Sequence, residues 1–313
     1  MDEILIIRPG ALGDTLMLVP ALVELQKGTR VTATARSPGL EALRHRGFRC
    51  VDFERAPWHL LFHEGPGKFP SSEIQPARVV AFMNDPEGLV RRNLTRFFPG
   101  AEVHVFPGYP EKSEKVHVAL YLARMLLEAG IPLDPEGCLD KALRKPLMRP
   151  PGEGIPKSRE GIVLHPGSGG REKNLGTDFW LETARGLIKK KLFGSEITVL
   201  LGPAEEALLG TFERTAAEGA GRLIFCPDMP ELCRLLGSAA LYLGHDSGVT
   251  HLSAMLGTPT AAVFKTSDPR AWSPLGPWVR VLAAGGESET REALDRAVED
   301  LKKCCSTPLA PGL

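Results

Sequence analysis

The stretch ILIIRPGALGDTLMLVPALVELQK, residues 4–27, decides the fold class of this chain. The four apolar residues at 4–7 are typical of a strand buried in a parallel sheet. A turn with proline and glycine follows, and apolar residues then recur at helical spacing over 12–27. A buried strand, a glycine turn and a helix form the first half of a βαβ unit, so we expect an α/β fold.

The same alternation continues along the chain until residues 145–156, which contain four prolines and two glycines. Because proline disfavours both helix and central strand, we predict an interdomain linker there. The sequence thus predicts two domains, 1–150 and 151–313, each with a doubly wound parallel sheet and with a ligand cleft between their carboxyl edges. We expect strands at 4–7, 31–35, 50–53, 79–82, 103–106, 161–164, 197–201, 223–226, 241–243 and 260–264, and helices at 12–27, 116–129, 178–190, 205–218, 230–236, 249–256 and 291–303.

The composition indicates a soluble globular protein. Among 313 residues, 38 Lys and Arg balance 38 Asp and Glu, so the net charge of +0 provides no polybasic field for nucleic acid. Hydrophobic residues at 43% and charged residues at 24% exclude global disorder. The six cysteines form no C-x-x-C pair and no zinc spacing, which predicts reduced thiols and no metal site. We expect a cytoplasmic protein, because no apolar run reaches a membrane span of about 20 residues and the chain begins with no signal peptide.

The first segment that could carry chemistry is RPGALGD, residues 8–14, directly after the first strand. Its glycines allow a sharp turn and a close approach of the backbone to a ligand. Asp14 falls in the first turn of the next helix, where it either complements the helix dipole or acts as a general base. The spacing is G-x-x-G, and Arg36 rather than a carboxylate ends the second strand, so among dinucleotides only NADP would fit.

Three strand-end segments of the second domain favour binding of a nucleoside diphosphate. HPGSGGREK, residues 165–173, offers backbone N–H groups, a serine hydroxyl and basic side chains to a phosphate. GHDSGVTH, residues 244–251, places small residues at a helix start, where Asp246 and Ser247 could also be helix caps. GPAEE, residues 202–206, adds carboxylates that either bind ribose hydroxyls or begin an exposed helix.

Together these strings resemble glycosyltransferase family 9, the ADP-heptose:lipopolysaccharide heptosyltransferases. The resemblance covers most of the chain and is strongest at residues 4–25, 161–173 and 243–277. It implies the GT-B fold, in which two Rossmann-like domains with parallel sheets face a central cleft. The first domain would bind the acceptor and the second the nucleotide sugar, with the C-terminal helix packing back on the first domain. Two departures bear on the donor: NLG at 174–176 replaces Trp-Pro, and Lys265 with Thr266 replaces Gly-Pro.

The resemblance also implies roles for particular residues. Asp14 matches the catalytic base, and Lys173 matches a basic catalytic residue beside the donor phosphates. Arg8 and Gly13 fall in the acceptor-binding part of the first domain. The residues that match the donor-binding loops are Ser168, Gly169, Glu206, Asp246, Ser247, Gly248 and His251.

The implied function is an inverting, metal-independent transfer of a heptosyl group from ADP-heptose to the lipopolysaccharide inner core. The acceptor would be a Kdo- or heptose-bearing lipid A, whose negative charge could meet Arg8, Arg91, Arg92 or Arg96. We expect no cofactor, no nucleic-acid partner, a monomer, and peripheral contact with the inner face of the inner membrane. Two alternatives stay open: a non-catalytic nucleotide-sugar-binding protein of the same fold, and an NADP-dependent oxidoreductase.

Overall fold

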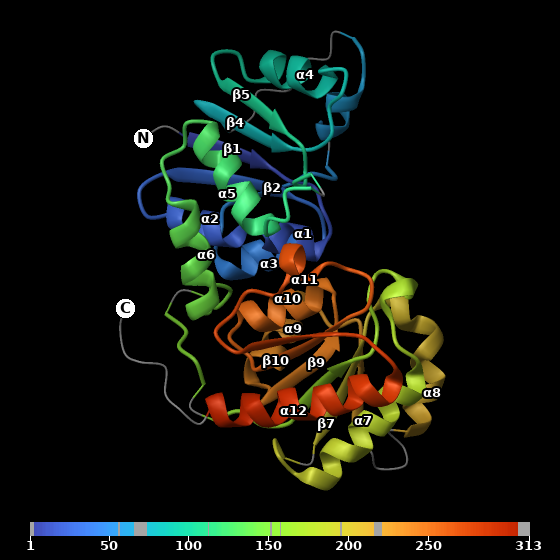
Figure 1. The fold of residues 1–313 in the computed structure, drawn as a ribbon. Coiled ribbons are helices and arrows are strands. Elements are labelled where there is room, and N and C mark those ends of the chain that lie inside the picture. Colours follow the sequence, from blue (N-terminus) through green and yellow to red (C-terminus); the bar gives the residue numbers. More distant parts are fainter. Residues whose placement is uncertain are drawn as a thin grey trace. The chain divides into compact units, whose positions relative to one another are not determined.

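The computed structural model describes residues 3–55, 57–65, 74–111, 113–150, 152–156, 158–194, 196–215 and 221–305. The chain divides into two compact units, Met1–Lys141 and Ala142–Leu313, and each is built around its own parallel sheet (Figure 1). This confirms the predicted α/β class with two parallel-sheet domains. All six cysteines are free thiols.

The first unit contains a five-stranded sheet with strand order β3-β2-β1-β4-β5. The central strand β1 pairs with β2 on one side and β4 on the other, so that Ile6 lies opposite both Ala33 and Val80. The chain therefore winds outward first in one direction and then in the other, as in a doubly wound fold. The strands are β1 (Glu3–Ile7), β2 (Arg30–Ala35), β3 (Cys50–Asp52), β4 (Arg78–Phe82) and β5 (Glu102–Phe106), and the helices are α1 (Leu12–Leu16), α2 (Val19–Leu25), α3 (Gly39–Arg46), η1 (Trp58–Phe62), α4 (Leu89–Phe97), α5 (Val118–Glu128) and α6 (Pro135–Arg144), the last of which runs across the unit boundary.

The second unit contains a six-stranded sheet with strand order β11-β10-β9-β6-β7-β8. Counted from its own first strand, this is the 3-2-1-4-5-6 order of dinucleotide-binding folds. The strands are β6 (Ile162–His165), β7 (Ile197–Leu201), β8 (Arg222–Phe225), β9 (Leu241–His245), β10 (Thr260–Phe264) and β11 (Val279–Ala283), and the helices are η2 (Arg171–Lys173), α7 (Thr177–Lys190), η3 (Pro203–Leu208), α8 (Leu209–Thr215), α9 (Met229–Ser238), α10 (Gly248–Met255), α11 (Pro269–Trp272) and α12 (Glu287–Cys305).

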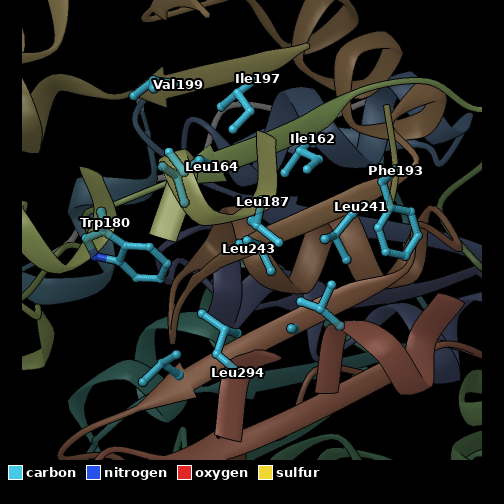
Figure 2. Close-up of a cluster of buried hydrophobic side chains, with 14 of the residues drawn as sticks. Ile162, Leu164, Trp180, Leu187, Phe193, Ile197, Val199, Leu241, Leu243 and Leu294 are labelled. Atoms are coloured by element: carbon cyan, nitrogen blue, oxygen red, sulfur yellow. The ribbon is translucent and has the colours of Figure 1, made fainter. Parts of the chain in front are cut away.

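A hydrophobic core of the second unit lies between its sheet and the helices α7 and α12. Alternate residues of neighbouring strands, such as Leu164 in β6 and Leu243 in β9, face Trp180 and Leu187 of α7 (Figure 2). Leu294 brings α12 into the same cluster, and α12 contacts β10, β11 and α7. Each such large apolar side chain contributes about 1.5–3 kcal/mol by leaving water. A smaller cluster in the first unit joins β1 and β4 to η1 and α4.

Two predicted helices are divided in the structure. The helix expected at 12–27 forms α1 and α2, because Pro20 has no N–H to donate to the preceding turn and instead lies in the first turn of α2. The helix expected at 205–218 begins as the 3₁₀ turn η3 and continues as α8, and its last residues, 216–218, lie outside the described residues.

The unit boundary lies between 141 and 142, before the predicted linker. Leu147 and Met148 are buried, and both donate backbone hydrogen bonds to the Met255 carbonyl at 2.9 and 3.0 Å. The proline-rich stretch thus begins as a segment docked on the second unit. The elements α6 and β11 were not predicted: α6 begins with Pro-Glu-Gly, and Arg280 interrupts the apolar run of β11.

Candidate functional site

The predicted site residues gather where neighbouring strands of each sheet end. In doubly wound sheets, ligands bind outside the carboxyl ends of strands where the winding direction reverses. In the second unit these strands are β6 and β9, which lead into the loops that begin at Pro166 and Asp246. In the first unit they are β1 and β4, and β1 leads directly into Arg8 and the start of α1.

Asp14 is held from two sides at the carboxyl end of β1. Its Oδ2 accepts a hydrogen bond of 2.9 Å from the Ala11 N–H at the start of α1. Its Oδ1 accepts one of 2.9 Å from the Tyr109 hydroxyl, which follows β5. An alanine Cβ at Gly10 would come within 2.4 Å of the Asp14 Cβ, so glycine is required for this tight turn. The Asp14 side chain remains 18% exposed.

The Arg8 side chain links the residues on either side of the Asp14–Tyr109 contact. Its guanidinium donates to the Asp14 carbonyl at 2.8 Å and to the Gly108 carbonyl at 2.6 Å, and lies 3.8 Å from Asp14 Oδ1. The Tyr109 ring covers it, with 5.2 Å between the guanidinium carbon and the ring centroid. Burial lowers the pKa of Arg8, an effect that the charge of Asp14 opposes. Burial, followed by the charge and hydrogen bond of Asp14, raises the pKa of Tyr109 to about 12.

Asp246 is the centre of the site in the second unit. Its Oδ2 accepts hydrogen bonds from Lys173 Nζ at 2.7 Å and from the Ser267 hydroxyl, while His251 Nε2 lies 3.5 Å from Oδ1. Burial alone would raise the pKa of Asp246, but the hydrogen bonds from His251, Lys173 and Ser267 outweigh it and lower the pKa. The carboxylate is therefore ionised, and it joins three side chains that come from η2, from the loop after β10 and from α10.

His165, the last residue of β6, contacts three side chains at the same edge of the sheet. Its Nδ1 lies 3.2 Å from the Tyr242 hydroxyl and 3.4 Å from Ser247 Oγ, and its Nε2 lies 3.6 Å from Glu205 Oε2. Burial would raise the pKa of Glu205, but the hydrogen bond and charge of His165 help to lower it. A Cβ at Gly167 would come within 2.1 Å of the Glu205 side chain, so the loop can pass this carboxylate only as glycine.

The loop after β6 is closed by Ser168 and Asn174. Ser168 Oγ lies 2.9 Å from the Gly170 carbonyl oxygen and 2.7 Å from Asn174 Oδ1, and its single hydrogen is donated to one of them at a time. Lys265, at the end of β10, donates to the Asn174 carbonyl at 3.1 Å. The two positions that depart from the family pattern therefore contact each other.

The structure brings most of the predicted donor-binding residues to one sheet edge. Lys173, Asp246 and His251 are in contact, and Ser247 is the N-cap of α10, where its side chain accepts from the Thr250 N–H. Gly248 begins α10, and a Cβ at Gly169 would meet open space. Glu206 is exposed in η3, whereas its neighbour Glu205 is the buried carboxylate.

Two contacts of the predicted residues were not predicted from the sequence. Tyr109 and Ser267 both donate to a predicted site carboxylate, yet Tyr109 is 95 positions away from Asp14 and Ser267 is 21 away from Asp246. In the first unit, Gly13 lies in α1 and Arg8 is buried. Both residues follow a strand end, and Ser267 also lies in the stretch 243–277, where the resemblance to the family is strongest.

A cavity of about 440 Å³ opens beside the ends of β4 and β5. Its wall includes Pro107, two residues before Tyr109, together with Asn84 and Arg91. The Asp85 carboxylate in the same wall accepts the N–H groups of Val90 and Arg91 at the start of α4. Within the described part of the chain, no group of three His, Cys, Asp or Glu side chains is placed to hold a metal ion, and no helix is long and apolar enough to cross a bilayer.

Several solved structures share the fold of this protein. ADP-heptose lipopolysaccharide heptosyltransferase II of E. coli has a TM-score of 0.70 and 17% identity, covering 98% of this chain and 100% of its own. E. coli heptosyltransferase WaaC with ADP-2-deoxy-2-fluoro heptose has a TM-score of 0.64 and 17% identity, covering 95% and 99%. A family 9 glycosyl transferase from Veillonella parvula DSM 2008 has a TM-score of 0.66 and 14% identity, covering 96% and 97%. The fold is therefore that of GT-B glycosyltransferases, as predicted.

The family follows from the sequence itself. Residues 110–300 match the model of glycosyltransferase family 9 (heptosyltransferase). This match spans more than half of the chain, and the chain belongs to this family of glycosyltransferases. A comparison with curated proteins finds no match.

Proposed function

We propose that this glycosyltransferase moves a heptosyl group from ADP-heptose to a Kdo- or heptose-bearing lipid A core. The observation that carries the proposal is the Lys173–Asp246–His251 cluster at the ends of β6 and β9. It combines the ammonium group of Lys173, a side chain that is 33% exposed, with the N-terminus of α10, and both favour a diphosphate. Two of the similar structures are named as heptosyltransferases, one for ADP-heptose and one with an ADP-heptose analogue bound.

In the proposed reaction the acceptor hydroxyl attacks the anomeric carbon from the face opposite the diphosphate. The new C–O bond forms as the bond to the diphosphate breaks, and the bonding electrons leave with the diphosphate oxygen. Asp14 takes the hydroxyl proton, and the configuration at the anomeric carbon inverts. Lys173, His251 and the N–H groups at the start of α10 stabilise the charge that develops on the leaving group. No metal ion or cofactor takes part in this scheme.

The cavity beside β4 and β5 supports an acidic acceptor. Its lining combines Arg91 and Asn84 with the apolar residues Val105 and Phe106. An arginine in a lining that also has apolar residues suits a sugar acid, because the guanidinium pairs with the carboxylate while the sugar ring packs against apolar side chains. Because a lipid A acceptor lies in a membrane, the protein would work in the cytoplasm in peripheral contact with the inner membrane, and we propose that it does so as a monomer.

The test is transfer by the Asp14→Asn variant. We expect heptosyl transfer from ADP-heptose to Kdo-lipid A to fall at least about a hundredfold, because the amide cannot take the proton. Binding of ADP, measured by calorimetry, should be unchanged, since Asp14 belongs to the first unit. Full transfer by the variant refutes Asp14 as the base.

The donor is tested by comparing ADP, UDP and GDP sugars in thermal-shift assays with the wild-type protein. Stabilisation by ADP-heptose above the others supports the proposed donor. Strong donor binding without transfer to any lipid A core would instead favour a non-catalytic nucleotide-sugar-binding protein.

A further inference from the structure

Tyr109 is the side chain that reaches Asp14 from farthest away in the chain. It follows β5, and its hydroxyl donates to Asp14 Oδ1 at 2.9 Å. The residue is 49% exposed, so it lies at the surface of the site rather than inside the core. A half-exposed aromatic residue that contacts the proposed base is well placed to act in the reaction of that base.

The two residues just before Tyr109 are anchored by side chains from two other parts of the first unit. The Gly108 carbonyl accepts from Arg8 at 2.6 Å, and the Pro107 carbonyl accepts from the Tyr121 hydroxyl at 3.0 Å. The Arg8 guanidinium also lies under the Tyr109 ring. These contacts hold the phenol in place without using its hydroxyl, which is directed to Asp14.

The two carboxylate oxygens of Asp14 have different surroundings. Oδ2 accepts from the Ala11 N–H and so belongs to the start of α1. Oδ1 accepts from Tyr109, and a carboxylate oxygen has a second lone pair for another donor. Oδ1 can therefore hold the Tyr109 hydroxyl and an acceptor hydroxyl at the same time.

We infer that Tyr109 is a positioning residue for Asp14, which it orients so that Oδ1 takes the proton of the acceptor hydroxyl. The inference rests on the proposed function, in which Asp14 is the base. Tyr109 itself gives up no proton in this step. Its hydroxyl fixes one torsion of the carboxylate, and such alignment is worth a large factor in rate when reacting atoms must meet at a defined angle.

The first experiment compares Tyr109→Phe with Tyr121→Phe in steady-state transfer. Tyr109→Phe removes only the hydroxyl that contacts Asp14, so we expect kcat to fall by about tenfold or more while KM for the donor is unchanged. Tyr121→Phe is the comparison variant, because it removes the α5 hydroxyl that binds the Pro107 carbonyl and leaves the Tyr109 hydroxyl in place. It removes one anchor of the segment, so kcat should fall less than in Tyr109→Phe. An unchanged kcat in Tyr109→Phe, or an equal loss in both variants, would overturn the inference.

The second experiment needs no activity and follows the tyrosine phenols by NMR in ¹³C-labelled protein. The Tyr109 signal, assigned by its loss in Tyr109→Phe, should titrate with a pKa of about 12 in the wild type. In Asp14→Asn that pKa should fall towards the ordinary value of about 10, because the charge of Asp14 is gone, whereas burial, which raises the pKa, and the charge of Arg8, which lowers it, both remain. An identical titration in both proteins shows that the contact is absent and refutes the inference. If Asp14→Asn kept its transfer activity while the Tyr109 titration changed, the contact between Tyr109 and Asp14 would be present but Asp14 would not be the base.

Discussion

At the scale of single residues, Asp246 shows how one carboxylate can organise a strand-end site. It is 7% exposed at its side chain and pairs with Lys173, which is 33% exposed. Removing one partner of a buried ion pair leaves the other charge without compensation, which is costly. The carboxylate therefore stabilises the edge of the sheet as well as arranging the proposed donor site.

We predict that Asp246→Asn lowers the free energy of unfolding by about 3 kcal/mol at pH 7. The pKa of Asp246 is lowered in the folded protein, so the folded state binds fewer protons than the unfolded state near and below the ordinary aspartate pKa of about 3.9. The contribution of the ionised Asp246 to the free energy of unfolding is therefore complete above the ordinary aspartate pKa, and it decreases as the pH falls below that pKa. The measurement is urea unfolding at pH 7, 5 and 3.5. The difference in free energy of unfolding between wild type and variant should be equal at pH 7 and pH 5, and smaller at pH 3.5.

The matched control is Asp295→Asn, which removes an exposed ion pair with Lys190 at 2.8 Å. Its effect should stay below about 1 kcal/mol, because solvent screens exposed pairs. A pH-independent difference for Asp246→Asn would contradict the assignment of an ionised, paired carboxylate.

At the scale of elements, the loop after β6 depends on glycine at one position and not at another. Gly167 passes the Glu205 side chain so closely that a Cβ would stand 2.1 Å away, whereas a Cβ at Gly169 would meet nothing within 4 Å. Glycine therefore occupies positions 167 and 169 of this loop for different physical reasons. The first permits close packing, and the second leaves room at the surface where a phosphate is proposed to bind.

We predict that Gly167→Ala lowers the free energy of unfolding by about 2 kcal/mol, because Glu205 and its contact with His165 must shift. Gly169→Ala should change it by less than about 0.5 kcal/mol. Thermal unfolding of the two variants beside the wild type is the measurement. Equal melting temperatures for both variants would show that the loop is not packed against Glu205 as described.

Element positions were predictable to the extent that they depend on local pattern. The strands β1, β7 and β10 agree with the apolar runs within one residue, because strands buried on both faces are apolar at every position. Helix ends were less predictable. The break between α1 and α2 depends on Pro20, and the division of η3 from α8 has no comparable signal in the apolar spacing.

At the scale of the whole molecule, the two units have separate sheets and separate cores. We predict that calorimetry of the full chain resolves two unfolding transitions. ADP at about 100 times its dissociation constant should raise the free energy of unfolding of the second unit by about 2.7 kcal/mol. The transition temperature of the first unit should stay unchanged. A single transition that ADP shifts as a whole would show that the units unfold together.

The sequence by itself determined the fold class, the family and the strand ends at which the site residues lie. These depend on apolar periodicity and on short glycine-rich strings, which are local properties of the chain. Tertiary structure alone decided that Tyr109 contacts Asp14, that Ser267 completes the Asp246 cluster, and that Glu205 rather than Glu206 is buried. The first two contacts join residues that are distant in sequence, and strand order brings them to one edge. The burial of Glu205 depends on which of two adjacent side chains a 3₁₀ turn directs inward. Neither the strand order nor the direction of a side chain in such a turn can be read from the local spacing of residues.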